Sequence, residues 1–242
     1  MHESIKMECV VCSSTTHQIK KDIYECKDCG HIYVNYMGDG LDYHKNTHRR
    51  DKKSGIRGNN EIDGETFTQA FHDRRKIICD NRKKYIKPYI ENLNSILDIG
   101  AGGGTFLNHV SKSFNTLHST EISTICINNL KKQGYYVYEG NFSDLKIIKK
   151  YDVVTCWHVL EHVKEMNSFI DKLSLVTGNY LFLEVPTKRG LINDVQENFD
   201  GHYHYFSKNS LKIKLEKNFK IVKIEEPGIQ KPSITVVAVP KS

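Results

Sequence analysis

Four cysteines near the start of the chain have the spacing of a metal site. Cys9 and Cys12 form one C-x-x-C pair, and Cys26 and Cys29 form a second. A tight turn in each pair can aim two thiolates at one point, and together they supply four ligands for a tetrahedral zinc ion. Four thiolates leave no position for water, so we expect a structural Zn²⁺. A thioredoxin-type redox pair is the alternative, but that motif is single and opens a helix.

A glycine-rich turn in the middle of the chain has the chemistry of a cofactor site. Residues 97–105 read LDIGAGGGT, and glycines allow a sharp turn and close approach of the backbone to a ligand. Glu121 follows Gly100 by about twenty residues, where an acid can hold both hydroxyls of a ribose. A dinucleotide fingerprint needs a glycine where this chain has Thr105. The turn therefore indicates an adenosine-bearing cofactor that is not a dinucleotide.

Short apolar runs alternate with helical stretches from residue 95 onward, and this alternation must position both features. Strands are expected at residues 95–99, 116–120, 135–138, 151–156, 180–185, 219–225 and 234–239, and helices at 104–111, 124–133, 166–175 and 211–217. Such alternation predicts an α/β fold, a parallel sheet covered on both faces. The last two strands have no helix between them, so we expect an antiparallel hairpin there. Ligands of such sheets bind at the carboxyl ends of the strands.

The motifs of this region resemble those of the class I S-adenosylmethionine-dependent methyltransferases. The D-x-G-x-G-x-G turn is similar to their motif I, and the segments GNFSDL (140–145) and YDVVTCWHVLEH (151–162) match later motifs. The resemblance covers residues 95–242 and implies a Rossmann-like sheet of seven strands, mostly parallel with the last antiparallel. It implies S-adenosylmethionine contacts from these residues: Asp98, Gly100, Ala101, Gly102, Gly104, Glu121, Asn141 and Phe142. We expect Trp157 to wall the cofactor or acceptor pocket, with core packing as the alternative.

Four histidines at expected strand ends are candidate general bases for methyl transfer. His158 and His162 follow the fourth strand, and His202 and His204 lie in the long connection between residues 186 and 206. Histidine suits the removal of a proton from a hydroxyl acceptor because its pKa lies near neutral pH. For His162, packing under the cofactor loop with a hydrogen bond to backbone is an equal alternative.

The stretch His158–His162 also reads H-x-x-E-H, the inverted zinc-protease motif. On a helix its three polar residues would share one face, so a metal is geometrically possible. The stretch follows a parallel strand directly and no distant third ligand is evident, so we do not expect a protease. A divalent ion that these residues hold for methyl transfer stays open as an alternative.

The amino-terminal cysteines add a resemblance to bacterial sugar methyltransferases with a Cys₄ module. This resemblance implies a small polar acceptor, an activated sugar or another precursor in polysaccharide biosynthesis, most simply methylated at oxygen. One alternative is an RNA methyltransferase that grips phosphates with its zinc module and basic segments. The chain lacks the N/D-P-P-Y motif and the Pro-Cys pair of two RNA-methylating classes. A non-catalytic binding protein on the cofactor fold is a further alternative.

Length and charge set the domain organisation. The 242 residues divide into a zinc-binding module (1–40), a helical connector (41–94) and a methyltransferase domain (95–242). In the connector, Ile77, Ile78, Tyr85 and Ile86 recur at helical spacing, so a helix at 69–89 should pack on the sheet with its Arg and Lys outside. The net charge of +6 is divided evenly between residues 1–94 and 95–242, which favours small anionic acceptors over nucleic acid. No secretory signal or membrane segment is evident, so we expect a cytoplasmic protein.

Overall fold

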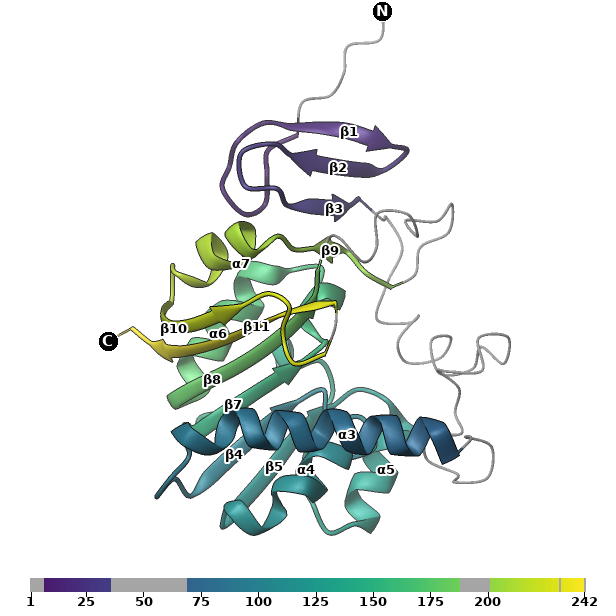
Figure 1. The fold of residues 1–242 in the computed structure, drawn as a ribbon, viewed down its shortest axis with the longest axis vertical. Coiled ribbons are helices and arrows are strands. Elements are labelled where there is room, and N and C mark those ends of the chain that lie inside the picture. Colours follow the sequence, from purple (N-terminus) through teal and green to yellow (C-terminus); the bar gives the residue numbers. More distant parts are fainter. Residues whose placement is uncertain (1–6, 36–68, 188–200, 231, 242) are drawn as a thin grey trace, which may run out of the picture.

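A computed structural model of the chain describes residues 7–35, 69–187, 201–230 and 232–241 (Figure 1). Residues 41–68 of the expected connector lie outside these ranges. The described helices of six or more residues are α3 (Gln69–Ile86), α4 (Thr105–Val110), α5 (Thr124–Lys132), α6 (Met166–Val176) and α7 (Lys208–Leu215). No helix in the described ranges is long and apolar enough to cross a membrane.

Seven strands form the large sheet in the order β10-β11-β8-β7-β4-β5-β6. They are β4 (Ser95–Ile99), β5 (Thr116–Glu121), β6 (Tyr136–Glu139), β7 (Tyr151–Trp157), β8 (Thr177–Pro186), β10 (Phe219–Glu225) and β11 (Ser233–Pro240). β4 pairs in parallel with both β5 and β7, so the strand order reverses at β4. β11 pairs antiparallel with β8 and with β10, which confirms the expected terminal hairpin.

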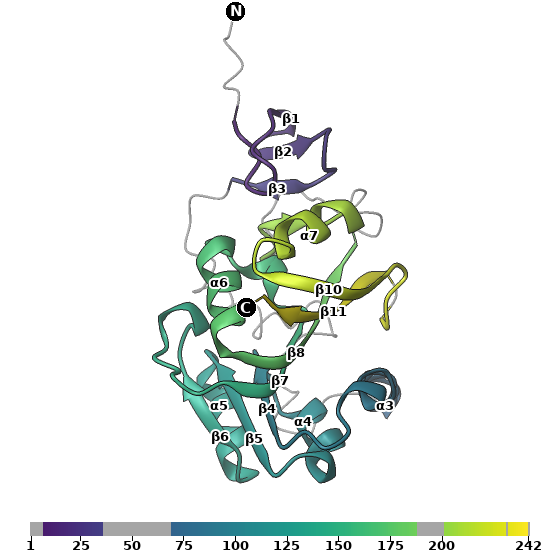
Figure 2. The same ribbon diagram turned by 90° about the vertical axis from the view of Figure 1, so that its left-hand side faces the viewer.

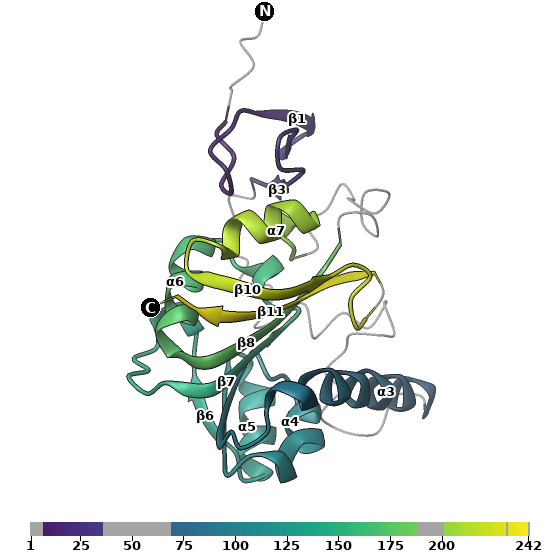
Figure 3. The ribbon, with the colours of Figure 1, turned by 60° about the vertical axis from the view of Figure 1, so that its left-hand side comes forward.

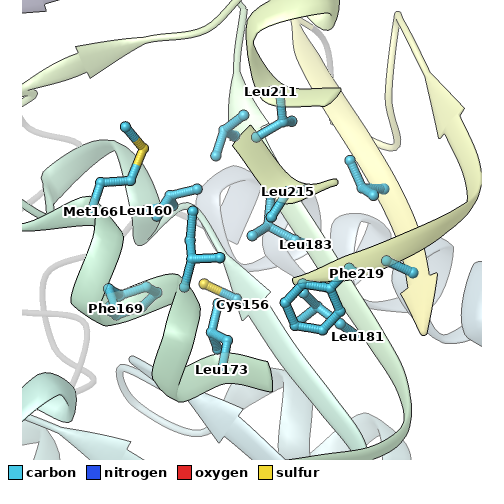
Figure 4. Close-up of a cluster of buried hydrophobic side chains, with 14 of the residues drawn as sticks. Cys156, Leu160, Met166, Phe169, Leu173, Leu181, Leu183, Leu211, Leu215 and Phe219 are labelled. Carbon is cyan, nitrogen blue, oxygen red and sulfur yellow. The ribbon is translucent and has the colours of Figure 1, made fainter. Parts of the chain in front are cut away.

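Two apolar layers cover the sheet because alternate strand residues point to opposite faces. On β8, Phe182 packs with side chains of α3, α4 and α5, whereas Leu181 and Leu183 pack with those of α6 and α7. Figure 4 shows Leu181 and Leu183 gathered with Leu215 and Phe219 in this second layer. Both faces of the sheet are thus buried, as the apolar strands predict.

The connector helix α3 forms as expected, but its inward face differs from the predicted one at Ile77 and Arg82. Ile77 is 59% exposed, whereas Cys79 and Ile86 are buried. Arg82 lies on the same inward face, with its side chain only 12% exposed. The prediction that the helix keeps its Arg and Lys outside is therefore wrong for Arg82, because a buried carboxylate receives this guanidinium.

A second, small sheet joins the amino-terminal module to the large domain. Its order is β1-β2-β3-β9, with β1 (Thr16–Lys20), β2 (Ile23–Cys26), β3 (Ile32–Val34) and β9 (His204–Tyr205). β9 belongs to the segment after β8, and it pairs antiparallel with β3 through Ile32–Tyr205 and Tyr33–His204. Figure 1 shows the module next to β9, and Figure 2 shows it next to α7. The module thus takes its last strand from the other end of the chain.

Polar contacts and a shared core fasten the module to the domain. Ser207 caps α7 and its Oγ donates a 2.6 Å hydrogen bond to the carbonyl oxygen of Cys29. The Nζ of Lys214, a residue only 2% exposed, donates a 2.7 Å bond to the carbonyl of Val10. Cys9, Cys26 and Cys29 belong to the same apolar cluster as α6 and α7. Figure 3 shows α7 between the module and the hairpin of β10 and β11.

Candidate functional site

The glycine turn between β4 and α4 adopts a backbone that favours glycine. Gly100, Gly102 and Gly104 have φ angles of 65°, 57° and 83°. A Cβ at Gly100 would lie 2.7 Å from Cγ2 of Val159, so no larger residue fits without movement. The turn therefore holds its backbone close to the segment that follows β7.

Glu121 at the end of β5 is tied to this turn by backbone amides. Its Oε2 accepts a 2.7 Å hydrogen bond from the Gly102 amide, and its Oε1 accepts from the amides of Ile122 and Ser123 at 2.8 and 2.9 Å. The carboxylate is 5% exposed. A carboxylate oxygen can accept two hydrogen bonds, so Oε2 keeps one acceptor position for a further donor.

Asp98 lies beneath the turn, 2% exposed, and accepts a 2.6 Å hydrogen bond from Thr155 Oγ1. Burial raises the pKa of its carboxyl group to about 7, although the Thr155 hydroxyl and Arg82 oppose this shift. Asp98 therefore titrates near neutral pH, unlike an exposed aspartate.

One cavity opens at the carboxyl ends of β4, β5 and β7, where ligands of such sheets bind. Its lining residues are Ile99, Gly100, Thr120, Glu121, Ile122, Gly140, Asn141, Phe142, His158, Val159, His162, Val163 and Phe169. Of the expected cofactor residues, Gly100, Glu121, Asn141 and Phe142 are among them. Asp98, Ala101, Gly102 and Gly104 support the turn without lining the cavity. A glycine backbone, a carboxylate acceptor and an aromatic side chain line this one hollow, and this set of groups fits S-adenosylmethionine.

Asn141 and Phe142 form the wall opposite the glycine turn. The Asn141 Oδ1 accepts a 3.3 Å bond from the Ser143 amide, and its Nδ2 donates to Asp144 Oδ2 at 3.0 Å. Phe142 is 4% exposed and meets Phe169 edge-on, with ring centroids 5.0 Å apart. The side chain of Asn141 thus stabilises the turn that presents the Phe142 ring.

Trp157 lies in the core beside the cavity rather than in its wall. The residue is 8% exposed, and its ring meets Phe106 edge-on with centroids 5.3 Å apart. The Arg82 guanidinium lies over the same ring, 4.7 Å from its centroid. The structure therefore places Trp157 as core packing, the alternative to a cofactor wall.

Four charged side chains form a buried row at the ends of β7 and β8, which we call the charge array: Arg82, Glu184, His158 and Glu161. Arg82 Nη2 donates to Glu184 Oε1 at 2.9 Å, and His158 Nε2 lies 3.1 Å from the same oxygen. The other ring nitrogen of His158 lies 3.3 Å from Glu161 Oε1. Positive and negative groups thus alternate along the row.

The array changes the pKa values of its members. Burial lowers the pKa of His158, but Glu161 and Glu184 outweigh it and raise this pKa to about 9. Burial raises the pKa of Glu184, but His158 and Arg82 outweigh it and lower this pKa to about 2. His158 has a φ of 57°, a left-handed conformation that non-glycine residues seldom adopt. Its ring is therefore held in one place by both backbone and charge.

His162 and His202, forty residues apart, meet at the edge of the cavity. Their ring centroids lie 4.5 Å apart, and His162 Nδ1 donates to the carbonyl of Gly201 at 2.7 Å. The backbone bond expected as an alternative for His162 is thus present. The stretch 160–162 is a single 3₁₀ turn rather than the longer helix of a protease motif.

His204 lies apart from these histidines, on β9 against the amino-terminal module. Its Nε2 donates to the carbonyl of Val163 at 3.0 Å, so its Nδ1 accepts from His31 Nε2 at 3.2 Å. Burial lowers the pKa of His204 to about 4. Both ring nitrogens have partners within the fold, and His204 is a structural residue here.

The four predicted ligands of the amino-terminal site come together in the folded module. Cys9 Sγ lies 3.6 Å from Cys29 Sγ, and Cys12 Sγ lies 3.5 Å from Cys26 Sγ. All four sulfur atoms lie within 4.8 Å of one another. Zn–S bonds of about 2.3 Å place sulfur atoms about 3.8 Å apart on a tetrahedron. The cluster therefore fits one tetrahedrally coordinated ion.

The sheet order and the glycine turn, with a carboxylate at the end of the neighbouring strand, define a class I methyltransferase fold. The family model described as a methyltransferase domain matches residues 70–224, and the chain belongs to this family. The matched region begins inside α3, so it includes Arg82. The protein is an S-adenosylmethionine-dependent methyltransferase.

Solved structures of low sequence identity share this fold. Magnesium protoporphyrin IX methyltransferase (ChlM) from Synechocystis PCC 6803 with bound SAM has a TM-score of 0.62 and 16% identity, and the match covers 86% of this chain and 100% of that one. N-methyltransferase NodS from Bradyrhizobium japonicum WM9, in complex with S-adenosyl-L-homocysteine, has a TM-score of 0.59 and 9% identity over 84% and 100%. DesVI from Streptomyces venezuelae has a TM-score of 0.58 and 14% identity over 85% and 100%. No curated protein matches the sequence significantly.

Three members of the charge array were not among the predicted site residues. Glu161 was considered only as part of the H-x-x-E-H stretch, Glu184 was not singled out, and Arg82 was expected in solvent. A signal for Arg82 did exist, because it shares a helical stripe with Cys79 and Ile86. Nothing in the sequence indicates that this stripe faces Glu184. The two meet because α3 packs across β8.

Proposed function

We propose that this methyltransferase acts at oxygen on a small polar acceptor, an activated sugar or another precursor of surface polysaccharide. The observation that carries the proposal is the group of Glu161, His162 and His202 at the edge of the cofactor cavity. A sulfonium methyl is already bound to a good leaving group, so the protein mainly orients the acceptor and assists loss of its proton. A hydroxyl needs that assistance, whereas a neutral amine attacks with its own lone pair.

In this proposal the cofactor binds in the cavity beside the glycine turn. Glu121 Oε2 accepts from a ribose hydroxyl, and Phe142 packs against the adenine. The acceptor approaches from the side of His158 and His162. His204 takes no part in proton transfer because both its ring nitrogens are bonded within the fold.

We further propose that Cys9, Cys12, Cys26 and Cys29 hold a structural Zn²⁺. The sulfur spacing supports this ion, and four protein ligands leave it no open position. This ion folds the module, and the module pairs with β9. Because one residue separates β9 from His202, the module also helps to position His202. The module is packed into the domain by β3 and α7, which favours a structural role over a free nucleic-acid-binding arm.

An acceptor screen tests the proposed substrate class. Release of S-adenosylhomocysteine is measured with nucleotide sugars, sugar phosphates and total RNA side by side. We expect turnover with a sugar acceptor, and ¹³C-methyl transfer followed by NMR should give the chemical shift of a methyl ether. Turnover confined to RNA, or a methyl group on nitrogen or carbon, would contradict the proposal.

A further inference from the structure

Glu161, His162 and His202 form a second group of metal-ligating side chains, which we call the Glu–His–His cluster. Each residue offers one ligand atom, and these three atoms lie within 4.8 Å of one another. Glu161 is 1% and His202 is 6% exposed. The three donors therefore converge in a buried place at the edge of the cofactor cavity.

Glu161 shares its cationic neighbour His158 with Glu184, so the charge of its carboxylate is only partly compensated. Neither of its carboxylate oxygens accepts a well-directed hydrogen bond from the described residues. Its nearest polar neighbours are ring nitrogens, His158 Nδ1 at 3.3 Å and His162 Nε2 at 3.8 Å. Native proteins seldom bury a carboxylate in this way, because the loss of hydration is costly. A cation between these ligands would compensate the carboxylate directly.

The tautomer of His162 leaves a ligand atom facing the cluster. Because a carbonyl oxygen only accepts, the 2.7 Å contact with Gly201 places the ring proton on Nδ1. In the neutral ring, Nε2 then carries a lone pair on the side of Glu161. Metal-bound histidines commonly donate their other ring N–H to a carbonyl or carboxylate, which fixes the ring and raises its basicity. Gly201 supplies this support to His162.

We propose that the Glu–His–His cluster binds a divalent transition-metal ion with open coordination positions. Two imidazoles and one carboxylate suit Zn²⁺, Mn²⁺, Co²⁺ or Fe²⁺, and three protein ligands leave room for water or substrate oxygen. His162 lines the cofactor cavity, so an open position lies beside the place of methyl transfer. The site is distinct from the Cys₄ cluster, which has no open position.

The ion's role in catalysis rests on the proposed function, whereas its binding does not. An acceptor hydroxyl on an open position becomes more acidic, since the ion stabilises the alkoxide. The hydroxyl proton passes to water, and the alkoxide oxygen attacks the methyl carbon. The O–C bond forms as the C–S bond breaks, and that bond's electron pair stays on sulfur to give neutral S-adenosylhomocysteine. Glu161 and His162 thus act as ligands rather than as general bases.

Binding of Mn²⁺ tests the site without any acceptor. Mn²⁺ prefers oxygen and nitrogen ligands over thiolates, so it leaves the zinc-loaded Cys₄ cluster alone. The electron paramagnetic resonance signal of free Mn²⁺ is followed during titration of the full chain. We expect about one bound Mn²⁺ per chain, and at least roughly tenfold weaker binding in Glu161→Gln and His202→Ala.

Three controls make the titration decisive. His109→Ala removes a histidine on α4 that pairs with Asp80, outside the cluster, and should leave Mn²⁺ affinity unchanged. His202→Asp replaces one ligand by another and should recover part of the affinity lost in His202→Ala. Circular dichroism and S-adenosylhomocysteine binding confirm that each variant is folded.

Two results would overturn the inference: no saturable Mn²⁺ binding by the wild-type chain, or equal affinity in wild type, Glu161→Gln and His202→Ala. Either result leaves the acceptor proposal standing, because the acceptor screen is run in parallel with and without added Mn²⁺ and measures product whether or not methyl transfer needs an ion. A failed acceptor screen in turn leaves a positive titration unaffected.

Discussion

The Cys₄ cluster and the carboxyl edge of the large sheet both gather buried polar side chains. They differ in whether each of these side chains finds its partners within the fold. In the Cys₄ cluster every ligand faces the other three, and the sulfur atoms are spaced for one ion. At the sheet edge, Glu184 is fully paired, whereas Glu161 accepts no well-directed hydrogen bond within the described residues. A closed set of donors stabilises a fold, whereas an incomplete set beside a cavity keeps capacity for a ligand.

The largest effect should come from breaking the closed set. Cys26→Ser removes one thiolate, so we expect loss of the zinc and of the roughly 10 kcal/mol that such an ion contributes to folding. Metal analysis of the purified protein and circular dichroism of the module measure the result. Cys79→Ser replaces a buried thiol on α3, outside the Cys₄ cluster, and is the matched control. This variant should keep the zinc of the Cys₄ cluster. Unchanged zinc content in Cys26→Ser would refute the site.

Removal of one partner from the charge array should be the next largest effect. Arg82→Ala leaves the buried Glu184 carboxylate with less compensation, and we expect the free energy of unfolding to fall by roughly 3–5 kcal/mol. Urea denaturation measures this loss. Arg74→Ala removes an exposed arginine from the same helix and should change stability by less than about 0.5 kcal/mol. Equal losses in the two variants would show that the array contributes no stability.

Asp98 should make the sheet edge sensitive to pH. Its pKa is raised from 3.8 to about 7 in the folded protein, so the native state binds more protons than the unfolded state between these values. The contribution of Asp98 to the free energy of unfolding is then most favourable below pH 4, and it is lost as the pH rises through about 7. A shift of this size corresponds to at most about 4 kcal/mol.

Asp98→Asn tests this contribution, because an amide oxygen still accepts from Thr155 but does not titrate. We expect the stability difference between pH 5 and pH 8, measured by urea denaturation without cofactor, to become smaller in the variant. An identical pH dependence in the two proteins would exclude Asp98 as its source.

A substitution at Glu121 tests the carboxyl edge of the large sheet through the affinity for S-adenosylmethionine. Glu121→Ala removes a charged acceptor worth about 1.5–3 kcal/mol, so we expect S-adenosylmethionine to bind about 10- to 100-fold more weakly by calorimetry. Glu139→Ala, at the end of the neighbouring strand β6 and outside the cavity lining, is the matched control. Unchanged affinity in Glu121→Ala would remove the ribose assignment.

The smallest effect is expected at the joint between the two regions. Ser207→Ala removes the cap of α7 together with the bond to the Cys29 carbonyl, and we expect a loss of about 1–2 kcal/mol in thermal or urea unfolding. Ser168→Ala, an exposed serine on α6, should change stability less. A larger loss in Ser168→Ala would mean that the cap does not hold the module.

The sequence predicts the large sheet well because local signals specify it. Apolar runs set β4 and β7, glycines set the turn, and the spacing to Glu121 places a carboxylate at the neighbouring strand end. These are interactions between residues near in the chain or at adjacent strand ends. The Cys₄ cluster can be predicted from the sequence equally well, because the spacing of the four cysteines alone brings their sulfur atoms together.

The remaining features depend on packing between distant segments. The Glu–His–His cluster needs His202 beside His162, and the loop that brings it there has no pattern that specifies its path. β9 has only two residues, too few for any periodicity, and its partner β3 lies about 170 residues earlier. Arg82 was assigned to solvent because charge favours exposure, and its contacts with Glu184 and Trp157 reverse that preference.

The pairing of β3 with β9 also fixes an order of events during synthesis. Cys29 and β3 leave the ribosome before β9 is made, and at about 5–20 residues per second β9 follows roughly 10–30 s later. During that interval the edge of β3 has no strand to pair with, and His31 lacks the His204 ring it bonds in the folded protein. Early zinc binding by the cysteines would fold the module in that interval, so β3 would present an open strand edge until β9 arrives to cover it.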